Sequence, residues 1–172
     1  MKKIILCFLV SASLIACTNQ ETKTEAKTET TGSVTTTGPD VDLIKQSITA
    51  FADGDWATYA STYADTAKSY HNIWPSNTDT TVGVKIPVLI EGFKKQRELM
   101  DGKLTMGGTI FEVVTMPDGS KYGHVWVDFT WKNKKGEVGK SVLFDSYGIN
   151  KDGKISYEWP IYDTKDVVKL GQ

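Results

Sequence analysis

The stretch VDLIKQSITAFADGDWATYASTYADTAKSYHN, residues 41–72, predicts a helix, a turn, a second helix and a strand. Apolar residues recur every three or four positions on both sides of Asp53-Gly54-Asp55, which is the spacing of one helical face. Gly54 can adopt the left-handed conformation that ends the first helix, and the Asp55 side chain can cap the second. The two helices therefore share one apolar side, which must pack against other elements.

The rest of the sequence predicts a third helix and more strands. From Val84 to Met100 the apolar residues again follow a helical face, and Pro87 is tolerated because it falls in the first turn. Long alternating runs follow, joined by short turns such as Pro117-Asp118-Gly119, which favours antiparallel hairpins. We therefore expect an α+β domain in which three N-terminal helices pack on a curved, mostly antiparallel five-stranded sheet.

The N-terminus has the features of a bacterial lipoprotein signal. Two lysines precede a short apolar run, which is too short to cross a bilayer, and Leu14-Ile15-Ala16-Cys17 follows. We expect cleavage before Cys17, acylation of its thiol and attachment to a membrane of the bacterial cell envelope, at the outer membrane or the periplasmic side. The alternative is an ordinary cleaved signal that leaves a free thiol.

This signal divides the chain into three parts. They are a signal peptide at residues 1–16, a lipidated cysteine with a flexible Thr/Glu/Lys-rich tether at 17–39, and one folded domain at 40–172. Cleavage would remove Cys7 and the lipid would use Cys17, so neither a disulfide nor thiol catalysis is expected. Loss of two lysines from 20 basic residues leaves 18 against 21 acidic ones, so we expect no nucleic-acid partner.

Three short motifs resemble those of the nuclear transport factor 2-like superfamily, which includes SnoaL-like polyketide cyclases and ketosteroid isomerases. They are Ala52-Asp53-Gly54-Asp55-Trp56, Tyr63-Ala64-Asp65 and Asp152-Gly153-Lys154-Ile155, and the resemblance covers about residues 41 to 163. It implies a cone-shaped domain, often a homodimer, with a pocket between the concave sheet and the helices. Many members of this superfamily have lost catalysis and serve as binding modules.

The ketosteroid isomerases suggest two reactive residues. Their general base falls on His71 and the protonated aspartate of their oxyanion hole on Asp145, whereas the tyrosine that completes the hole falls on Ser47, a weaker donor. Steroid isomerase activity is therefore not expected. His71 could still act as a base, and Asp145 in an apolar cavity could act as a neutral acid. Alternatively, His71 caps a strand end and Asp145 accepts hydrogen bonds from a neighbouring strand.

Further candidates for ligand contact lie on predicted strands and on the second helix. Family spacing places Glu158 and Tyr162 on the inward face of the last strand, and Tyr63 is a third candidate. Trp126 and Asp128 point inward if the next turn adds an even number of residues relative to the family, and outward if it adds an odd number. An acidic lining of this kind would suit a small polar or cationic molecule.

Three functions remain open on the sequence. The first is a lipid-anchored envelope protein whose domain binds a small molecule or a partner protein without catalysis. The second is an isomerase, cyclase or dehydratase that uses His71 as base and Asp145 as acid. The third is a non-catalytic dimeric scaffold with a filled cone. No cofactor or metal is expected, because His71 and His124 are the only histidines and no phosphate-binding or dinucleotide motif is present.

Overall fold

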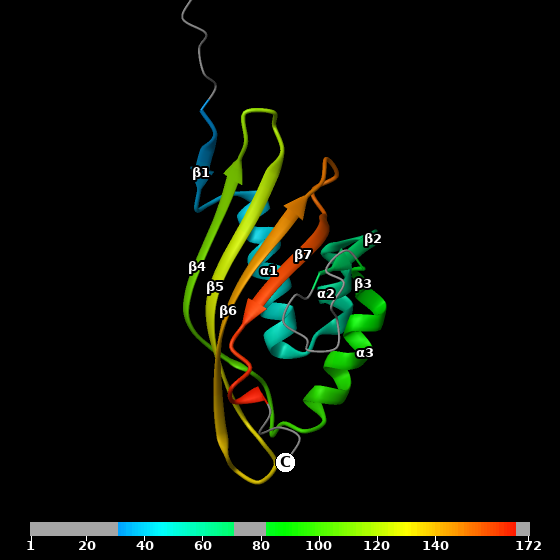
Figure 1. Ribbon diagram of the computed structural model, residues 1–172, viewed down its shortest axis with the longest axis vertical. Helices are drawn as coiled ribbons and strands as arrows, with labels where there is room; N and C mark the ends of the chain where they lie inside the picture. Colours follow the sequence, from blue (N-terminus) through cyan, green and yellow to red (C-terminus); the bar gives the residue numbers. More distant parts are fainter. Residues whose placement is uncertain (1–30, 71–81, 168–172) are drawn as a thin grey trace, which may run out of the picture.

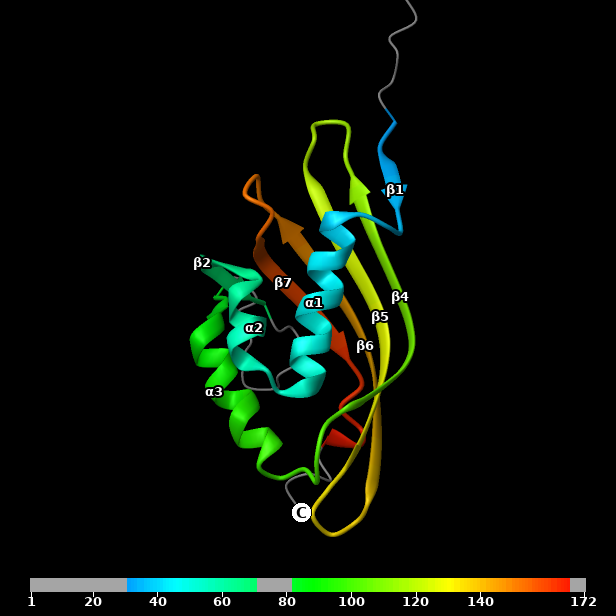
Figure 2. The same ribbon diagram turned by 180° about the vertical axis from the view of Figure 1, so that it is seen from behind.

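The computed structural model describes residues 31–70 and 82–167. The elements in chain order are β1 (Ser33–Thr35), α1 (Pro39–Asp53), α2 (Trp56–Ser61), β2 (Tyr63–Ser69), β3 (Val84–Lys85), α3 (Ile86–Arg97), β4 (Thr105–Thr115), β5 (Lys121–Lys132), β6 (Val138–Ile149) and β7 (Ile155–Tyr162). The helices lie on one side of a single sheet, and the other side of the sheet faces the viewer in Figure 1 (Figures 1 and 2).

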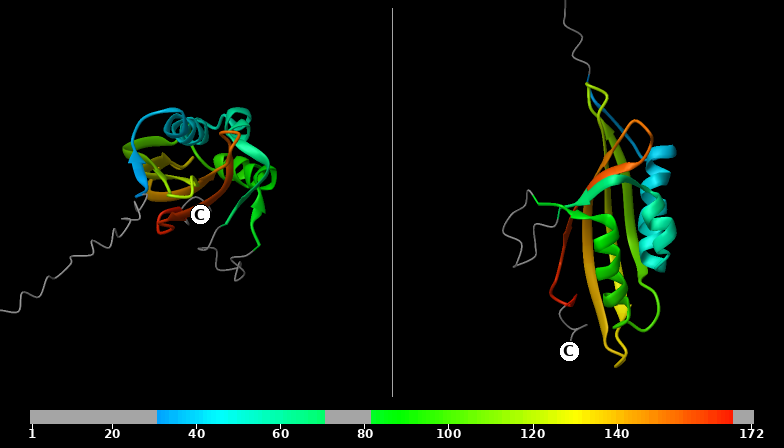
Figure 3. Two further views of the ribbon diagram at one scale, coloured as in Figure 1. Left: turned by 90° about the horizontal axis from the view of Figure 1, so that it is seen from above. Right: turned by 90° about the vertical axis from the view of Figure 1, so that its right-hand side faces the viewer.

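The described strands form a mixed sheet in the order β1-β4-β5-β6-β7-β2-β3. The β2–β7 pair is parallel and the other pairs are antiparallel. Figure 3 shows the sheet bending around the helices. The predicted α+β class is confirmed, but the strand count of five is wrong, because the sheet has seven strands within residues 31–70 and 82–167 alone.

The two additional strands are short and lie at the edges of the sheet. β1 pairs with β4 and falls within the segment predicted as a tether, and β3 pairs with the last two residues of β2. Three-residue and two-residue strands are too short to show an alternating pattern, and backbone hydrogen bonds to an existing edge are enough to form them. Their pairing therefore could not be predicted from side-chain periodicity.

The turn between α1 and α2 contains the predicted left-handed glycine and the predicted aspartate cap. Gly54 ends α1 with φ of 74°, and its N–H donates to the Phe51 carbonyl at 3.2 Å. The Asp55 carboxylate accepts from the Thr58 N–H at 3.1 Å and caps α2. The third helix differs in detail from the predicted Val84 to Met100, since α3 begins at Ile86 and ends at Arg97.

One apolar layer fills the space between α1 and the sheet. Ile44 and Ile48 on α1 are buried, as are the inward residues Val125 and Val127 of β5. A Cβ atom at Gly123 would overlap the Ile44 side chain, so glycine lets α1 approach the sheet closely here. No helix within the described residues is long and apolar enough to cross a membrane.

Candidate functional site

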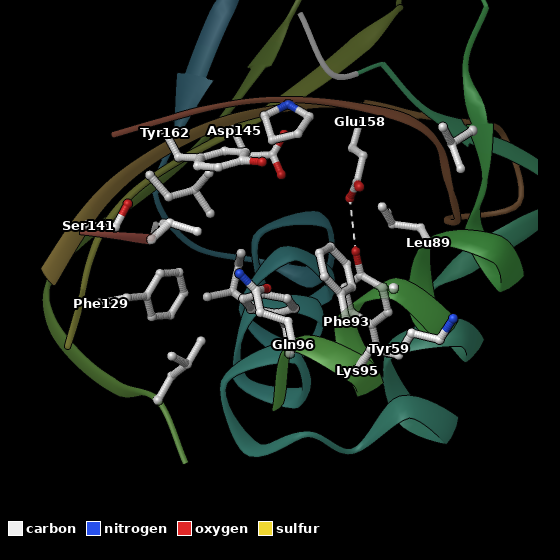
Figure 4. A pocket seen from close by; sticks show the side chains of 18 of the residues that line it. Tyr59, Leu89, Phe93, Lys95, Gln96, Phe129, Ser141, Asp145, Glu158 and Tyr162 are labelled. Atoms are coloured by element: carbon white, nitrogen blue, oxygen red, sulfur yellow. Dashed lines mark hydrogen bonds between the residues drawn. The ribbon is translucent and has the colours of Figure 1, made fainter. Parts of the chain in front are cut away.

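A pocket of about 800 Å³ lies between α2, α3 and the inner face of β5, β6 and β7 (Figure 4). Most of its lining is aromatic or aliphatic, including Phe51, Phe93, Phe129, Trp131, Leu143 and Met100. Its rim carries exposed apolar residues, since Val82 and Val88 are 60% and 63% exposed. The volume falls within the usual range of small-molecule sites, roughly 300–1,000 Å³. The cone is therefore hollow, unlike the filled cone of the scaffold hypothesis.

The buried end of the pocket is polar. Asp145 on β6 and Glu158 on β7 both line it and are only 3% and 2% exposed. Tyr147 pairs directly with Glu158, and Asp145 pairs with Pro160, so the two carboxyl groups are diagonal neighbours on one face of the sheet. In Figure 4 both carboxyl groups point into the pocket, and the Tyr59 hydroxyl reaches Glu158 from the helical side.

Glu158 accepts hydrogen bonds from several hydroxyl groups. Tyr59 donates to its Oε2 at 3.2 Å, and Tyr63 makes a short hydrogen bond to the same oxygen. Ser69, which is opposite Glu158 in the parallel β2–β7 pair, also bonds to the carboxylate. Burial raises the pKa of Glu158 above its usual value, whereas these hydroxyl donors act in the opposite direction because they stabilise the ionised form.

Asp145 has much less support for a negative charge. Burial, followed by repulsion from Glu158, raises its pKa well above the usual value, and hydrogen bonds from the Tyr147 side chain and from the backbone of Ser146 and Trp159 only partly oppose this shift. Its Oδ1 atom is buried and has no hydrogen-bond partner among residues 31–70 and 82–167. Two neighbouring buried carboxyl groups do not both ionise readily. The surroundings therefore favour the negative charge on Glu158 and the protonated form on Asp145.

The tyrosines around this pair stay protonated. Burial, followed by the nearby carboxylate charge, raises the pKa of Tyr59, Tyr63 and Tyr147 well above 10. Burial raises the pKa of Tyr162, nearer the rim, to about 12. All four hydroxyl groups are therefore hydrogen-bond donors over the range in which the carboxyl groups titrate.

The structure separates the predicted ligand contacts into three groups. Glu158 and Tyr162 line the pocket. Ser47 and Tyr63 are buried behind the lining, where Ser47 Oγ lies 3.5 Å from the Tyr63 hydroxyl. Trp126 and Asp128 lie on the opposite face of the sheet and are exposed. Of the two proposed reactive residues, Asp145 lines the pocket, whereas His71 and the predicted lipidation site Cys17 lie outside the described residues.

The inward orientation considered for Trp126 and Asp128 is wrong, and the β5–β6 register gives the reason. Val125 pairs with Asp145, and directly paired residues share one face of a sheet. Because Asp145 lies on the inner face of the sheet, Val125 does too, and alternation sends Trp126 and Asp128 outward.

Sequence reasoning missed Tyr59 and Tyr147 as parts of the polar end. Tyr59 follows the apolar face of a predicted helix, and only the tertiary structure brings its hydroxyl to Glu158. Tyr147 could have been found, because it lies two residues from Asp145 on the same strand and therefore on the same face.

A row of apolar side chains crosses the outer face of the sheet. Ile110 pairs with Trp126, Trp126 with Phe144, and Phe144 with Ile161, so one residue comes from each of β4, β5, β6 and β7. Ile110 is 60% exposed and Ile161 45% exposed, and the Trp126 and Phe144 ring centroids lie 4.8 Å apart. We call these four residues the outer row.

Metal binding has no visible basis in the described part of the chain. Within residues 31–70 and 82–167, no group of three or more histidine, cysteine, aspartate and glutamate side chains lies close enough to hold a metal ion. His124 is on the outer face, with its Nδ1 atom 3.2 Å from Glu112 Oε1.

The fold is shared with proteins of known structure. No protein-family model matches this sequence, and no curated protein is significantly similar to it. Among solved structures, a SnoaL-like protein from Shewanella putrefaciens aligns with a TM-score of 0.55 and 7% identity, over 78% of this chain and 86% of that chain. A ketosteroid isomerase-like protein from Erwinia carotovora aligns with a TM-score of 0.52 and 17% identity, over 69% and 89%.

A nuclear transport factor 2-like protein from Burkholderia xenovorans aligns with a TM-score of 0.53 and 13% identity, over 78% of this chain and 96% of that chain. These identities are low, so the alignments establish the fold alone. The chain has the fold shared by SnoaL-like, ketosteroid isomerase-like and nuclear transport factor 2-like proteins, as the sequence motifs predicted.

Proposed function

We propose that this domain binds a small molecule with a largely apolar body in the pocket between α2, α3 and the sheet. The observation that carries the proposal is the Asp145 carboxyl group, whose Oδ1 is buried without a partner in the described chain, on the wall of a cavity of about 800 Å³. A buried polar atom without a partner costs about 1–3 kcal/mol. A ligand that bonds to this oxygen removes that cost, while its apolar body covers the aromatic lining.

Gly92 offers a direct test, because it lines the pocket and a Cβ atom there would meet no other atom within 4 Å. We expect Gly92→Trp to occupy the cavity and abolish binding of Nile red, a neutral apolar dye, measured by fluorescence. Gly92→Ala is the matched control and should bind the dye as the wild type does. Equal binding by all three chains, or no binding by the wild type, would contradict the proposal.

An isomerase, cyclase or dehydratase is the second candidate function, and the raised pKa of Asp145 favours it. In this reading His71 takes a proton from a carbon next to a carbonyl group, and Asp145 donates to the oxygen on which charge develops. His71→Ala and Asp145→Asn should then abolish turnover of any substrate found without lowering the melting temperature. Undiminished turnover by either variant excludes the mechanism.

Attachment to the cell envelope through a lipid on Cys17 is part of the proposal and rests on the Leu14-Ile15-Ala16-Cys17 motif. We expect the protein to sediment with bacterial membranes and Cys17→Ser to move to the soluble fraction. Mass spectrometry of the N-terminal peptide should find the acylated cysteine. A free thiol at Cys17 would favour the ordinary cleaved signal instead.

We also propose that two copies of the chain meet through the outer row. The row contains no charged side chain and its members are in register across four strands, so it can pack against its own two-fold copy. The expected mature chain has 18 basic and 21 acidic residues, so its small formal net charge of −3 causes limited repulsion between two copies. Exposed apolar surface of this kind is typical of an interface.

A further inference from the structure

The ionisable carboxyl groups of the pocket lie at its buried end, and no cationic side chain lies beside them among the described lining residues. Asp145 and Glu158 occupy its buried end, and Lys95 on α3 is the one cationic side chain among the described residues that line it. Lys95 is exposed, so it stays in water at the rim. Arg97 is turned away from the cavity, because its guanidinium donates to the carbonyl groups of Phe51 and Ala52 at the end of α1.

The two carboxyl groups differ in the hydrogen bonds that they already accept. Glu158 already accepts hydrogen bonds from Tyr59, Tyr63 and Ser69, so it has little capacity left for a ligand. Asp145 accepts a hydrogen bond from the Tyr147 hydroxyl group. Its buried Oδ1 atom has no hydrogen-bond partner among the described residues. A ligand group that enters this end therefore meets the Asp145 carboxyl group beside Glu158, whose hydroxyl donors favour its ionised form.

We infer that the buried end of this pocket binds the ammonium group of an apolar amine, and that Asp145 releases its proton when the amine binds. This inference rests on the proposed binding function and adds the chemical class of the ligand. The amine arrives as a cation, the Asp145 O–H bond breaks, and the proton passes to the buffer. The product is an ammonium–carboxylate pair, with Glu158 adding a second negative charge nearby.

The surroundings favour a cation over an anion. The groups that face Asp145 are the Glu158 carboxylate from β7 and the hydroxyl groups of Tyr147, Tyr59 and Tyr63 from β6, α2 and β2. None of these groups carries a positive charge, so a carboxylate ligand would be repelled by Glu158 without compensation. The aromatic walls formed by Phe51, Phe93 and Phe129 suit both an apolar body and a nearby cation.

A matched series of ligands tests the inference. We would titrate the full-length Cys17→Ser chain with 1-adamantanemethylamine, 1-adamantanemethanol and 1-adamantanecarboxylate, which share one apolar body and carry a positive charge, no charge and a negative charge. Isothermal titration calorimetry at pH 7 in phosphate and in Tris would count the protons released. We expect the amine to bind at least about tenfold more tightly than the alcohol. It should release roughly one proton.

Two variants with the same substitution separate the site from general effects of charge. Asp145→Asn should lose both the preference for the amine and the proton release. Asp128→Asn, at an exposed aspartate on the outer face, should behave as the wild type does. Both variants are first checked for folding by circular dichroism, and Asp145→Leu is the substitute if Asp145→Asn does not fold.

The outcomes also separate this inference from the proposed binding function. Tighter binding of the alcohol or the carboxylate, or amine binding without proton release, overturns the ammonium assignment. The binding function still stands in that case, if Nile red binds and Gly92→Trp abolishes it. Failure of all three adamantane ligands together with failure of Nile red overturns both.

Discussion

Tyr59 on α2 donates a hydrogen bond of 3.2 Å to Glu158 on β7, and so joins two residues 99 positions apart at the buried end of the pocket. This bond connects the helical layer to the sheet at the point where the fold buries a negative charge. The charge on Glu158 in turn helps to keep Asp145 protonated. The protonation state of the pocket therefore depends on how the helices dock.

Tyr59→Phe should destabilise the protein by about 1–3 kcal/mol, because a buried charged group loses one hydrogen-bond donor. Urea denaturation at pH 7 measures the loss. Tyr157→Phe is the matched control, since Tyr157 lies on the outer face and its pKa is shifted by partial burial rather than by a carboxylate. Equal losses in the two variants would show that the Tyr59–Glu158 bond adds no stability of its own.

Asp145→Asn should become more stable relative to the wild type as the pH rises above about 4. The pKa of Asp145 is higher in the folded chain than in the unfolded chain, so the unfolded chain loses its proton first and unfolding becomes more favourable with rising pH. The difference should grow by up to about 1.4 kcal/mol per pH unit until the pH reaches the folded pKa.

Urea denaturation from pH 4 to pH 8 would measure this difference. Asp128→Asn, the same substitution at an exposed aspartate on the outer face, is the control. A constant difference for Asp145→Asn would mean that Asp145 is ionised in the folded chain. That result would also contradict the expectation that Asp145 releases a proton when an amine binds.

Gly123→Ala should cost about 1–3 kcal/mol, since the added methyl group would overlap the Ile44 side chain. The cost should be smaller in an Ile44→Val background, because valine lacks the Cδ1 atom that the new Cβ would meet. A double-mutant cycle by urea denaturation measures the coupling. Additive effects would show that α1 does not pack on β5 at this point.

Trp126→Glu should weaken self-association at least about tenfold, because the substitution places a charge in the centre of the outer row. Sedimentation velocity over a range of protein concentrations measures the dissociation constant. Val138→Glu is the control, since Val138 is 56% exposed on β6 but lies outside the outer row. A wild-type chain that sediments as a monomer at high concentration would contradict the proposed dimer and indicate a different partner for this face.

The amino-acid sequence contained most of the architecture in local signals. The Gly54 and Asp55 turn, the helical spacing of α1 and α2, and the alternation in β5 and β6 each depend on residues close together in the chain. Such patterns arise from the period of the helix or strand itself. The short edge strands β1 and β3 were missed because they form through backbone pairing and show no periodic pattern.

The resemblance to a known family also singled out Asp145 and Glu158, since the spacing of that family places both on inward faces. It could not decide the face of Trp126, because a shift of one residue in the β5–β6 register exchanges the two faces of a strand. Nor could it show that Tyr59 meets Glu158 or that the Asp145 oxygen is left without a partner. Those relations depend on contacts between residues far apart in the chain, and only the tertiary structure brings them together.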